Sequence, residues 1–142
     1  MDERDKEILR ALVKNARVSY VELSKKLKIT EAAVRKRVKK LEQKGHLKGF
    51  TTIVDPEILG YCAVAVIGID TKPDSLMSAF EALKGLKGIK YISLSSGDHM
   101  VMFEAWCKDK AELSLLISKV KGMEGITKVC PAILLKGKEF IA

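Results

Sequence analysis

A ten-residue pattern occurs twice in the second half of the chain. It reads KGLKGIKYIS from Lys84 and KGMEGITKVC from Lys121, and the two copies align without gaps. Each copy follows a segment with apolar residues at helical spacing, which are Leu76, Met77, Phe80 and Leu83 in one segment and Leu113, Leu116, Ile117 and Val120 in the other. An apolar, strand-like run precedes each helical segment. The duplication therefore limits this half of the chain to two consecutive strand–helix–strand units.

Four strands are expected in this half, near residues 61–70, 89–96, 100–107 and 126–136. The resulting order, βαββαβ, is that of the ferredoxin-like arrangement, an antiparallel four-stranded sheet with two helices on one face. The first and last strands are nearly continuous in apolar residues, which indicates burial on both faces of the sheet. A second copy of the module is expected to cover the face that the helices leave open.

Charged residues are distributed unevenly along the chain. Residues 1–54 hold 15 Lys and Arg against 7 Asp and Glu, whereas residues 55–142 hold 11 of each. The net charge of +8 therefore belongs to the first third, which also contains all five arginines. Arginine is the cation suited to bidentate contacts with phosphates and bases. The chain is thus expected to consist of two modules with different partners.

The first module begins with two predicted helices. Residues 4–13 have an acidic first turn, which suits the positive end of the helix dipole, and apolar residues at helical spacing, namely Ile8, Leu9, Leu12 and Val13. Ser19 and Glu22 have the spacing of a capping box, in which each side chain satisfies a backbone N–H. This spacing predicts a second helix that continues to about Leu27.

A third helix is predicted over residues 30–44, with Thr30 as its N-cap. At about 100° per residue, Val34, Val38 and Leu41 form one narrow stripe, which must be buried. The opposite face carries cations with few interleaved acids, an arrangement that is unfavourable for a solvated helix. A short turn before a helix that is small at its start and cationic outside is typical of a helix-turn-helix, whose second helix enters the DNA major groove. A merely basic three-helix unit is the alternative.

DNA contacts are expected from the starts of the second and third helices and from the outer face of the third. The residues predicted to lie nearest base edges are Thr30, Glu31, Ala32, Arg35 and Lys36, with Arg35 as the candidate for reading a guanine. The residues predicted to follow the phosphate backbone are Arg37, Lys39, Lys40 and Lys44. Ser19, Tyr20 and Ala33 complete the candidate set.

A linker is expected between the modules. Residues 50–54 have extended character and predict a linker strand, and the Pro- and Gly-containing turn at residues 55–60 marks the boundary. The predicted division is a helix-turn-helix domain at residues 1–54, with the linker reaching about residue 60, and a ferredoxin-like domain at residues 61–142. The fold class is α+β, with a winged-helix-like first domain.

No catalytic, cofactor or metal site is expected. His99 beside Asp98 invites a general-base interpretation, but no nucleophile stands at a recognisable motif spacing and no Gly-rich phosphate loop is present. Cys62, Cys107 and Cys130 lack C-x-x-C spacing and are predicted to be reduced core residues. The longest apolar run is far too short to span a bilayer and no signal segment opens the chain, so a cytoplasmic protein without a membrane partner is expected.

Several of these stretches together resemble the Lrp/AsnC family of transcriptional regulators, also called feast/famine regulators. They are DERDKEILRALVKNARVSYVELSKKL, ITEAAVRKRVKKLEQKG, GFTTIVDPEILG and the SSGDH turn, and the resemblance covers essentially the whole chain. It implies a DNA-binding regulator that dimerises through its C-terminal sheets, assembles into tetramers or octamers, and places paired helix-turn-helix units on pseudo-palindromic double-stranded DNA. The scarcity of Asn and Gln in a Lys-rich chain favours a thermophilic, archaeal member.

The resemblance also implies that the C-terminal domain binds a small effector, usually an amino acid, near the turn between the two central strands. The residues of this chain at that turn are Ser95, Ser96, Gly97, Asp98, His99 and Met100. The family commonly reads T-G-x-x-D there, and Met100 takes the place of the last Asp, so a thioether replaces a carboxylate that could hold an ammonium group. An amino acid, another ligand and a purely structural assembly all stay open.

A second departure from the family lies in the turn of the helix-turn-helix, where many members have Gly and this chain has Lys28. Lysine is tolerated there if φ is negative, and costs about 1 kcal/mol if the backbone must be left-handed. The alternative function, from another class, is a small-molecule-binding ferredoxin-like oligomer whose basic domain contacts RNA or protein.

Overall fold

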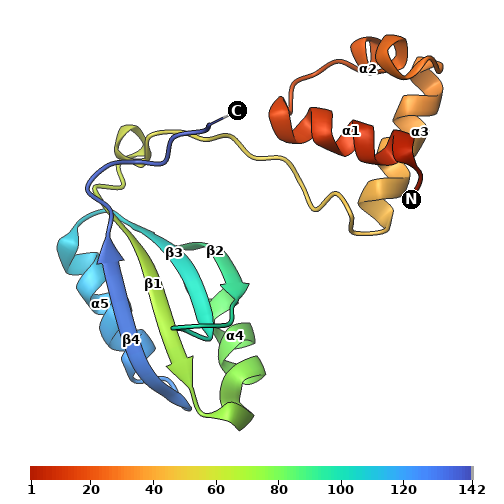
Figure 1. The fold of residues 1–142 in the computed structure, drawn as a ribbon. Coiled ribbons are helices and arrows are strands. Elements are labelled where there is room, and N and C mark those ends of the chain that lie inside the picture. Colours follow the sequence, from red (N-terminus) through yellow and green to blue (C-terminus); the bar gives the residue numbers. More distant parts are fainter. Residues whose placement is uncertain (142) are drawn as a thin grey trace. The chain divides into compact units, whose positions relative to one another are not determined.

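The structure, a computed structural model, describes residues 1–141 and divides into two compact units, residues 1–53 and residues 54–139. The elements of each unit are labelled in Figure 1. In the first unit they are α1 (Glu3–Lys14), α2 (Tyr20–Leu27) and α3 (Glu31–Gln43). In the second they are β1 (Ala63–Thr71), α4 (Leu76–Lys84), β2 (Ile89–Leu94), β3 (Val101–Cys107), α5 (Lys110–Lys121) and β4 (Ile126–Ile133), with short 3₁₀ turns at Pro56–Leu59 and Pro73–Ser75.

The helical unit packs around a small apolar core. Its buried side chains are Ile8, Leu12, Leu23, Val34, Val38 and Leu41. The predicted stripe of α3 is confirmed, because all three of its members are buried. Val13, which was expected to face inward with Ile8, is instead 76% exposed. Ile8 and Leu12 are one helical turn apart, whereas Val13 lies a further 100° or so around the helix.

Polar side chains cap the starts of all three helices. Ser19 Oγ accepts from the Glu22 N–H at 3.0 Å, which is one of the two bonds of the predicted capping box. The complete reciprocal pair is formed at α1, where Asp2 and Asp5 each accept from the other's backbone N–H. This box does more than cap α1, because it also receives a side chain from α3.

Arg37 joins the start of α1 to α3. Its Nη1 donates to Asp2 Oδ2 and to Asp5 Oδ1, both at 2.7 Å. The Asp5 backbone N–H and then Arg37 lower the pKa of Asp2. Burial opposes ionisation of Asp5, but the hydrogen bonds from Arg37 and from the Asp2 backbone outweigh it and lower the pKa of Asp5. We call this group, Asp2, Asp5 and Arg37, the acidic clamp.

The second unit is a four-stranded antiparallel sheet in the order β2-β3-β1-β4. Figure 1 shows α4 and α5 on the same side of this sheet. Alternate side chains of the two central strands, from Ala63 to Ile69 and from Val101 to Cys107, are buried against those helices. The predicted βαββαβ order and the two-helix layer are thereby confirmed. The side chains between them lie on the other face, which no helix of residues 54–139 covers.

The repeated pattern forms the same structure twice, at the end of α4 and at the end of α5. Its first glycines, Gly85 and Gly122, cap the helices with φ of −83° and −82°. Its second glycines, Gly88 and Gly125, have φ of +95° and +80°, a backbone that L side chains rarely adopt. The second glycine of each copy is therefore the one that turns the chain from helix to strand.

Three expectations about the elements were wrong. Residues 50–54 form no strand, because extended propensity yields a ladder only beside a neighbouring strand, and none of the described chain pairs with them. The expected end of β2 at residue 96 is loop, and β4 ends at Ile133 instead of residue 136. Cys62 is exposed and precedes β1, whereas Cys107 is buried and burial raises the pKa of its thiol.

Lys28 ends α2 in the left-handed region, with φ of +52° and ψ of +48°. Among residues 1–141 it is the one non-glycine residue with positive φ. A left-handed backbone costs an L-residue about 1–2 kcal/mol relative to glycine.

Among the helices of residues 1–141, none has the length and apolar character that a membrane span requires.

We expect Lys28→Gly to raise the free energy of unfolding by about 1 kcal/mol. Glycine removes the left-handed strain, and the greater entropy that it gives the unfolded chain offsets only part of this gain. Urea denaturation followed by circular dichroism measures this. Lys28→Ala, which removes the charge but keeps the strain, is the control and should show no such gain. Equal stabilisation by both variants would mean that charge repulsion, and not backbone strain, is relieved.

The acidic clamp should make the helical unit acid-sensitive. A carboxyl whose pKa is lowered by folding contributes stability at pH values above its ordinary pKa of about 4, and this contribution is lost as the pH falls through the lowered value. We expect Asp5→Asn to cost about 1.5–3 kcal/mol at pH 7, the range for a hydrogen bond to a charged group, and to flatten the fall in stability below pH 4. Thermal melts between pH 2.5 and 7 measure this, with the exposed Glu22→Gln as control. Parallel pH profiles of wild type and Asp5→Asn would contradict it.

Candidate nucleic-acid interface and effector loop

The outer face of α3 carries four exposed cations, Arg35, Lys36, Lys39 and Lys40. Arg35 Nη2 lies 3.2 Å from Glu31 Oε1, and its guanidinium lies 5.4 Å from the centroid of the Tyr20 ring. Both Arg35 and Glu31 are well exposed, so their pair is weak and screened by salt. Tyr20 of α2 and Glu31 therefore orient Arg35 without holding it, and a stronger acceptor can replace Glu31.

The start of α3 is small and open. Thr30 Oγ1 accepts from the Ala33 N–H at 3.1 Å, which fixes the first turn. Thr30, Glu31 and Ala32 are exposed, whereas Ala33 is half-buried. The helix N-terminus also carries a partial positive charge. Together these features let this end of α3 approach a polyanion closely.

Other members of the predicted set have structural partners. Arg37 is held by the acidic clamp and its side chain is 27% exposed, so its guanidinium is already engaged by carboxylates. Ser19 uses its hydroxyl to cap α2. Tyr20 is half-buried against the helical core and lies under Arg35. Lys44 is exposed at the opposite end of α3 from Thr30.

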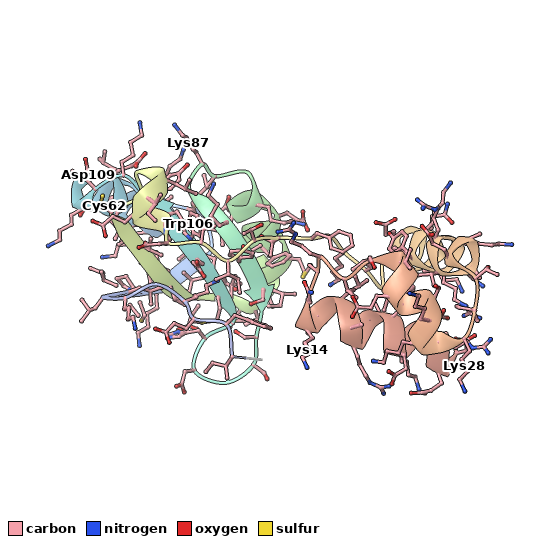
Figure 2. The ribbon with its side chains drawn as sticks, turned by 90° about the horizontal axis from the view of Figure 1, so that it is seen from above. Lys14, Lys28, Cys62, Lys87, Trp106 and Asp109 are labelled. Carbon is pink, nitrogen blue, oxygen red and sulfur yellow. The ribbon has the colours of Figure 1, made fainter. Side chains whose placement is uncertain are left out.

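Lys28 is a cation of this surface that the sequence did not single out for DNA contact. It is exposed between α2 and α3, two residues before the Thr30 cap. Figure 2 shows that Lys28 and Lys14 project from opposite ends of the helical unit. The place of Lys28 in the turn is visible in the sequence and could have suggested this contact. Of the two backbone alternatives stated above for Lys28, the structure shows the left-handed one.

The loop between β2 and β3, residues 95–100, is closed by its own hydrogen bonds. Ser95 Oγ donates to the His99 carbonyl at 2.7 Å, and the Ser95 N–H donates to the Met100 carbonyl at 2.9 Å. Ser96, Gly97 and Asp98 are exposed at its tip. Asp98 is the loop's one carboxylate.

His99 and Met100 turn away from the tip and onto β1. His99 Nδ1 lies 3.5 Å from Asp70 Oδ1, and its ring lies where a Cβ on Gly68 would come within 2.3 Å. The sulfur of Met100 accepts from the Thr71 N–H at 3.4 Å. The histidine therefore faces Asp70 and not its sequence neighbour Asp98. No group of three or more His, Cys, Asp or Glu among residues 1–141 is arranged to hold a metal ion.

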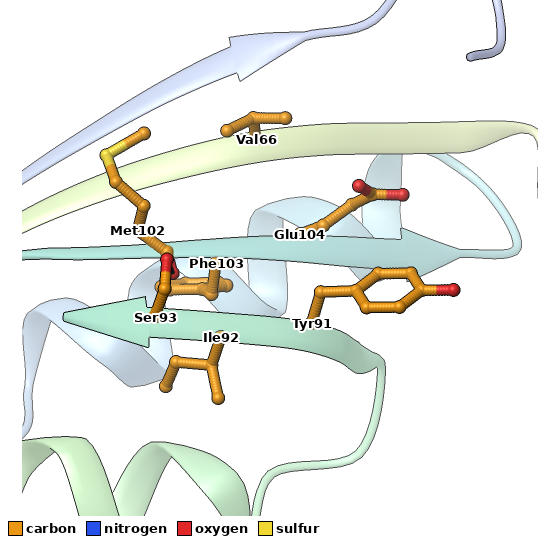
Figure 3. A pocket seen from close by; sticks show the side chains of 7 residues that line it. All are labelled: Val66, Tyr91, Ile92, Ser93, Met102, Phe103 and Glu104. Carbon is orange, nitrogen blue, oxygen red and sulfur yellow. Dashed lines mark hydrogen bonds between the residues drawn. The ribbon is translucent and has the colours of Figure 1, made fainter. Parts of the chain in front are cut away.

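A shallow pocket lies on the sheet face opposite the helices. Figure 3 shows the Glu104 carboxylate and the Tyr91 ring at one end of it and the Met102 side chain at the other. The residues that line it are Val66, Tyr91, Ile92, Ser93, Met102, Phe103 and Glu104. None of the predicted effector residues is among them, so the loop and the pocket are separate features.

Comparisons with known proteins agree with this geometry. Residues 1–48 match a family model described as winged helix-turn-helix DNA-binding. The HTH-type transcriptional regulator LrpA of Pyrococcus horikoshii is 48% identical over 137 residues, which are 96% of this chain and 97% of that protein.

Solved structures show the same fold. E. coli AsnC superposes with a TM-score of 0.73 at 28% identity, covering 100% of this chain and 97% of its own. A transcriptional regulator of Neisseria meningitidis in complex with L-Met gives a TM-score of 0.75 at 20% identity, covering 99% and 93%. With this degree of identity along its whole length, the chain belongs to the Lrp/AsnC family of helix-turn-helix transcriptional regulators.

Proposed function

We propose that this protein is a sequence-specific DNA-binding transcription regulator that acts as a homodimer or a larger assembly. The main support for DNA binding is the outer face of α3, where four exposed cations follow a helix start made of small, exposed residues. A helix of this kind fits the major groove with its N-terminal residues toward base edges. The 48% identity to a Pyrococcus regulator supports the same function.

The residues of α3 divide by role. Thr30, Glu31, Ala32, Arg35 and Lys36 lie on the first two turns and are proposed to read base edges. Lys39, Lys40 and Lys44 lie further along and are proposed to contact phosphates. Arg37 is left out of the contact set, because Asp2 and Asp5 already neutralise it. We propose that it instead holds α3 at its angle to α1.

Arg35→Ala should weaken binding to a cognate site by about 1–3 kcal/mol and relax sequence preference, because a bidentate contact to a base is lost. Lys39→Ala should weaken all duplexes alike and reduce the slope of log K against log salt by about one unit. Fluorescence anisotropy at several salt concentrations, on cognate and scrambled duplexes, measures both effects. Equal losses by Arg35→Ala on both duplexes would refute the base-reading role.

The alternative, a basic domain that contacts RNA or protein, predicts a different ranking. A domain built for RNA would bind single-stranded RNA at least as well as duplex DNA at matched salt. We instead expect this protein to bind duplex DNA more tightly than single-stranded RNA, and Arg35→Ala to reduce that preference.

The uncovered face of the sheet is our reason for proposing a homodimer. One face is packed under α4 and α5, while the other carries Val66, Met102 and Tyr91 toward solvent. In a symmetric dimer both copies use the same face, so one contact would bury the open faces of both chains.

We also propose that the loop of residues 95–100 binds a small amino-acid-like effector. The regulator of Neisseria meningitidis with the same fold was solved with L-Met. In this chain Met100 is turned onto Thr71, so Asp98 at the exposed tip is the carboxylate left to hold an ammonium group.

A panel of amino acids tested by thermal shift should contain one that raises the Tm by a few degrees at concentrations well above its Kd. Asp98→Asn should abolish this rise, whereas Asp74→Asn, an exposed acid outside the loop, should keep it. The absence of any shift across the panel would exclude a free amino acid as the effector.

A further inference from the structure

The sheet face opposite the helices carries a group of apolar side chains around one acid near its centre, with Asp70 and Lys128 paired at one end. Along β1 and β3 it carries Val64 opposite Trp106, and Val66 opposite Glu104. Tyr91 of the edge strand β2 lies on the other side of Glu104. The Glu104 residue is 7% exposed even in the single chain. A carboxylate therefore lies nearly buried in the middle of the face that we propose to be covered by a second copy.

Glu104 has two partners, and one of them comes from beyond the sheet. Trp106 Nε1 donates to Glu104 Oε1 at 2.7 Å. Lys138 Nζ lies 2.6 Å from Glu104 Oε2 and 4.3 Å from the centroid of the Tyr91 ring. Lys138 belongs to the segment after β4, residues 134–139, which we call the tail.

The tail starts on the sheet and returns across its open face. The Leu134 N–H donates to the Val64 carbonyl at 2.9 Å, which continues the contact of β4 with β1. Lys138 then contacts Glu104 of β3 and Tyr91 of β2, on the far side of β1. The tail therefore brings a cation to the one acid at the centre of this face.

The electrostatics of this pair change when the face is covered. The Lys138 side chain is 48% exposed in the single chain, so water still solvates one of the two charges. A covering partner would remove that water. Two charges that leave water together are tolerated if they are paired and hydrogen-bonded, whereas a single unpaired charge is strongly unfavourable.

We propose that Lys138 is a specificity-determining residue for self-association: by neutralising Glu104 it makes the open sheet face able to bind a second copy of this chain. The inference rests on the proposed homodimer and adds which residue permits it. A chain without this cation would bring an uncompensated carboxylate into the contact. Related sheets that lack the matching cation would be rejected in the same way.

The two members of the pair should respond differently to substitution. Lys138→Gln leaves Glu104 charged and without its cation in the covered face. Glu104→Gln keeps an acceptor for Trp106, and the freed lysine can extend its long side chain to water. The double variant removes both charges, which is often close to neutral for a buried pair.

The tail supplies a matched control. Lys136 forms an ion pair with Glu139, and both side chains are well exposed, at 82% and 65%. Lys136→Gln therefore makes the same chemical change two residues away from Lys138, at a pair that does not involve the sheet face.

The experiment is sedimentation equilibrium of the full chain over a concentration series at 150 mM salt, with circular dichroism to verify folding. We expect Lys138→Gln to raise the dimer Kd by about tenfold or more, and Lys136→Gln to leave it unchanged. The double variant Lys138→Gln with Glu104→Gln should return to within about threefold of wild type, a non-additivity that a general loss of tail packing would not give.

Three results would overturn the inference. A wild-type monomer at all concentrations would remove the proposed homodimer and this inference with it, while leaving the DNA-binding tests of α3 untouched. A wild-type dimer with equal Kd for Lys138→Gln and Lys136→Gln would remove the inference alone. Loss of the helical signal in Lys138→Gln would make the pair a requirement of folding and not of association.

Discussion

A sheet with helices on one side has a second side that must also be satisfied, and this constraint governs the C-terminal unit. The apolar side chains of β1 alternate between the two faces, so burying one face under α4 and α5 leaves the other with Val64 and Val66. The position of Glu104 on that second face makes the problem electrostatic as well as hydrophobic. A cation from the same chain, Lys138, meets the electrostatic part of this problem. In the homodimer proposed above, apolar surface from a second copy would meet the hydrophobic part.

Charge in the helical unit is used in two different ways within one short helix. Arg37 and Arg35 are two positions apart, and each has a carboxylate within reach. Arg37 is half enclosed and is held by two acids that themselves form a cap, which makes it part of the framework. Arg35 is exposed, with one weak partner on its own helix. Residue type is the same, and the difference in role comes from burial and from the number of partners.

Local sequence patterns predicted much of this structure. The spacing of Val34, Val38 and Leu41 and the duplicated glycine pattern predicted helix faces and strand order, because periodicity is a property of short segments. Contacts between distant segments could not be predicted in this way. Nothing near Arg37 in sequence indicates Asp2, nothing near Glu104 indicates Lys138, and His99 faces Asp70 instead of its neighbour. The expected strand at residues 50–54 failed for a related reason, since a strand requires a partner whose presence no single segment reveals.

The order β2-β3-β1-β4 has a consequence for the duplicated halves of the C-terminal unit. One half supplies β1 and β2 and the other supplies β3 and β4, yet neither pair of strands is adjacent in the sheet. Every hydrogen-bonded ladder, β1 with β3, β1 with β4 and β2 with β3, joins one half to the other. Neither half can therefore form a ladder by itself. The β2–β3 ladder closes over the short loop at residues 95–100, whereas both ladders of β1 require long-range loop closure between the halves. The strands of the two halves are therefore interleaved, and the complete sheet forms only when both halves are present.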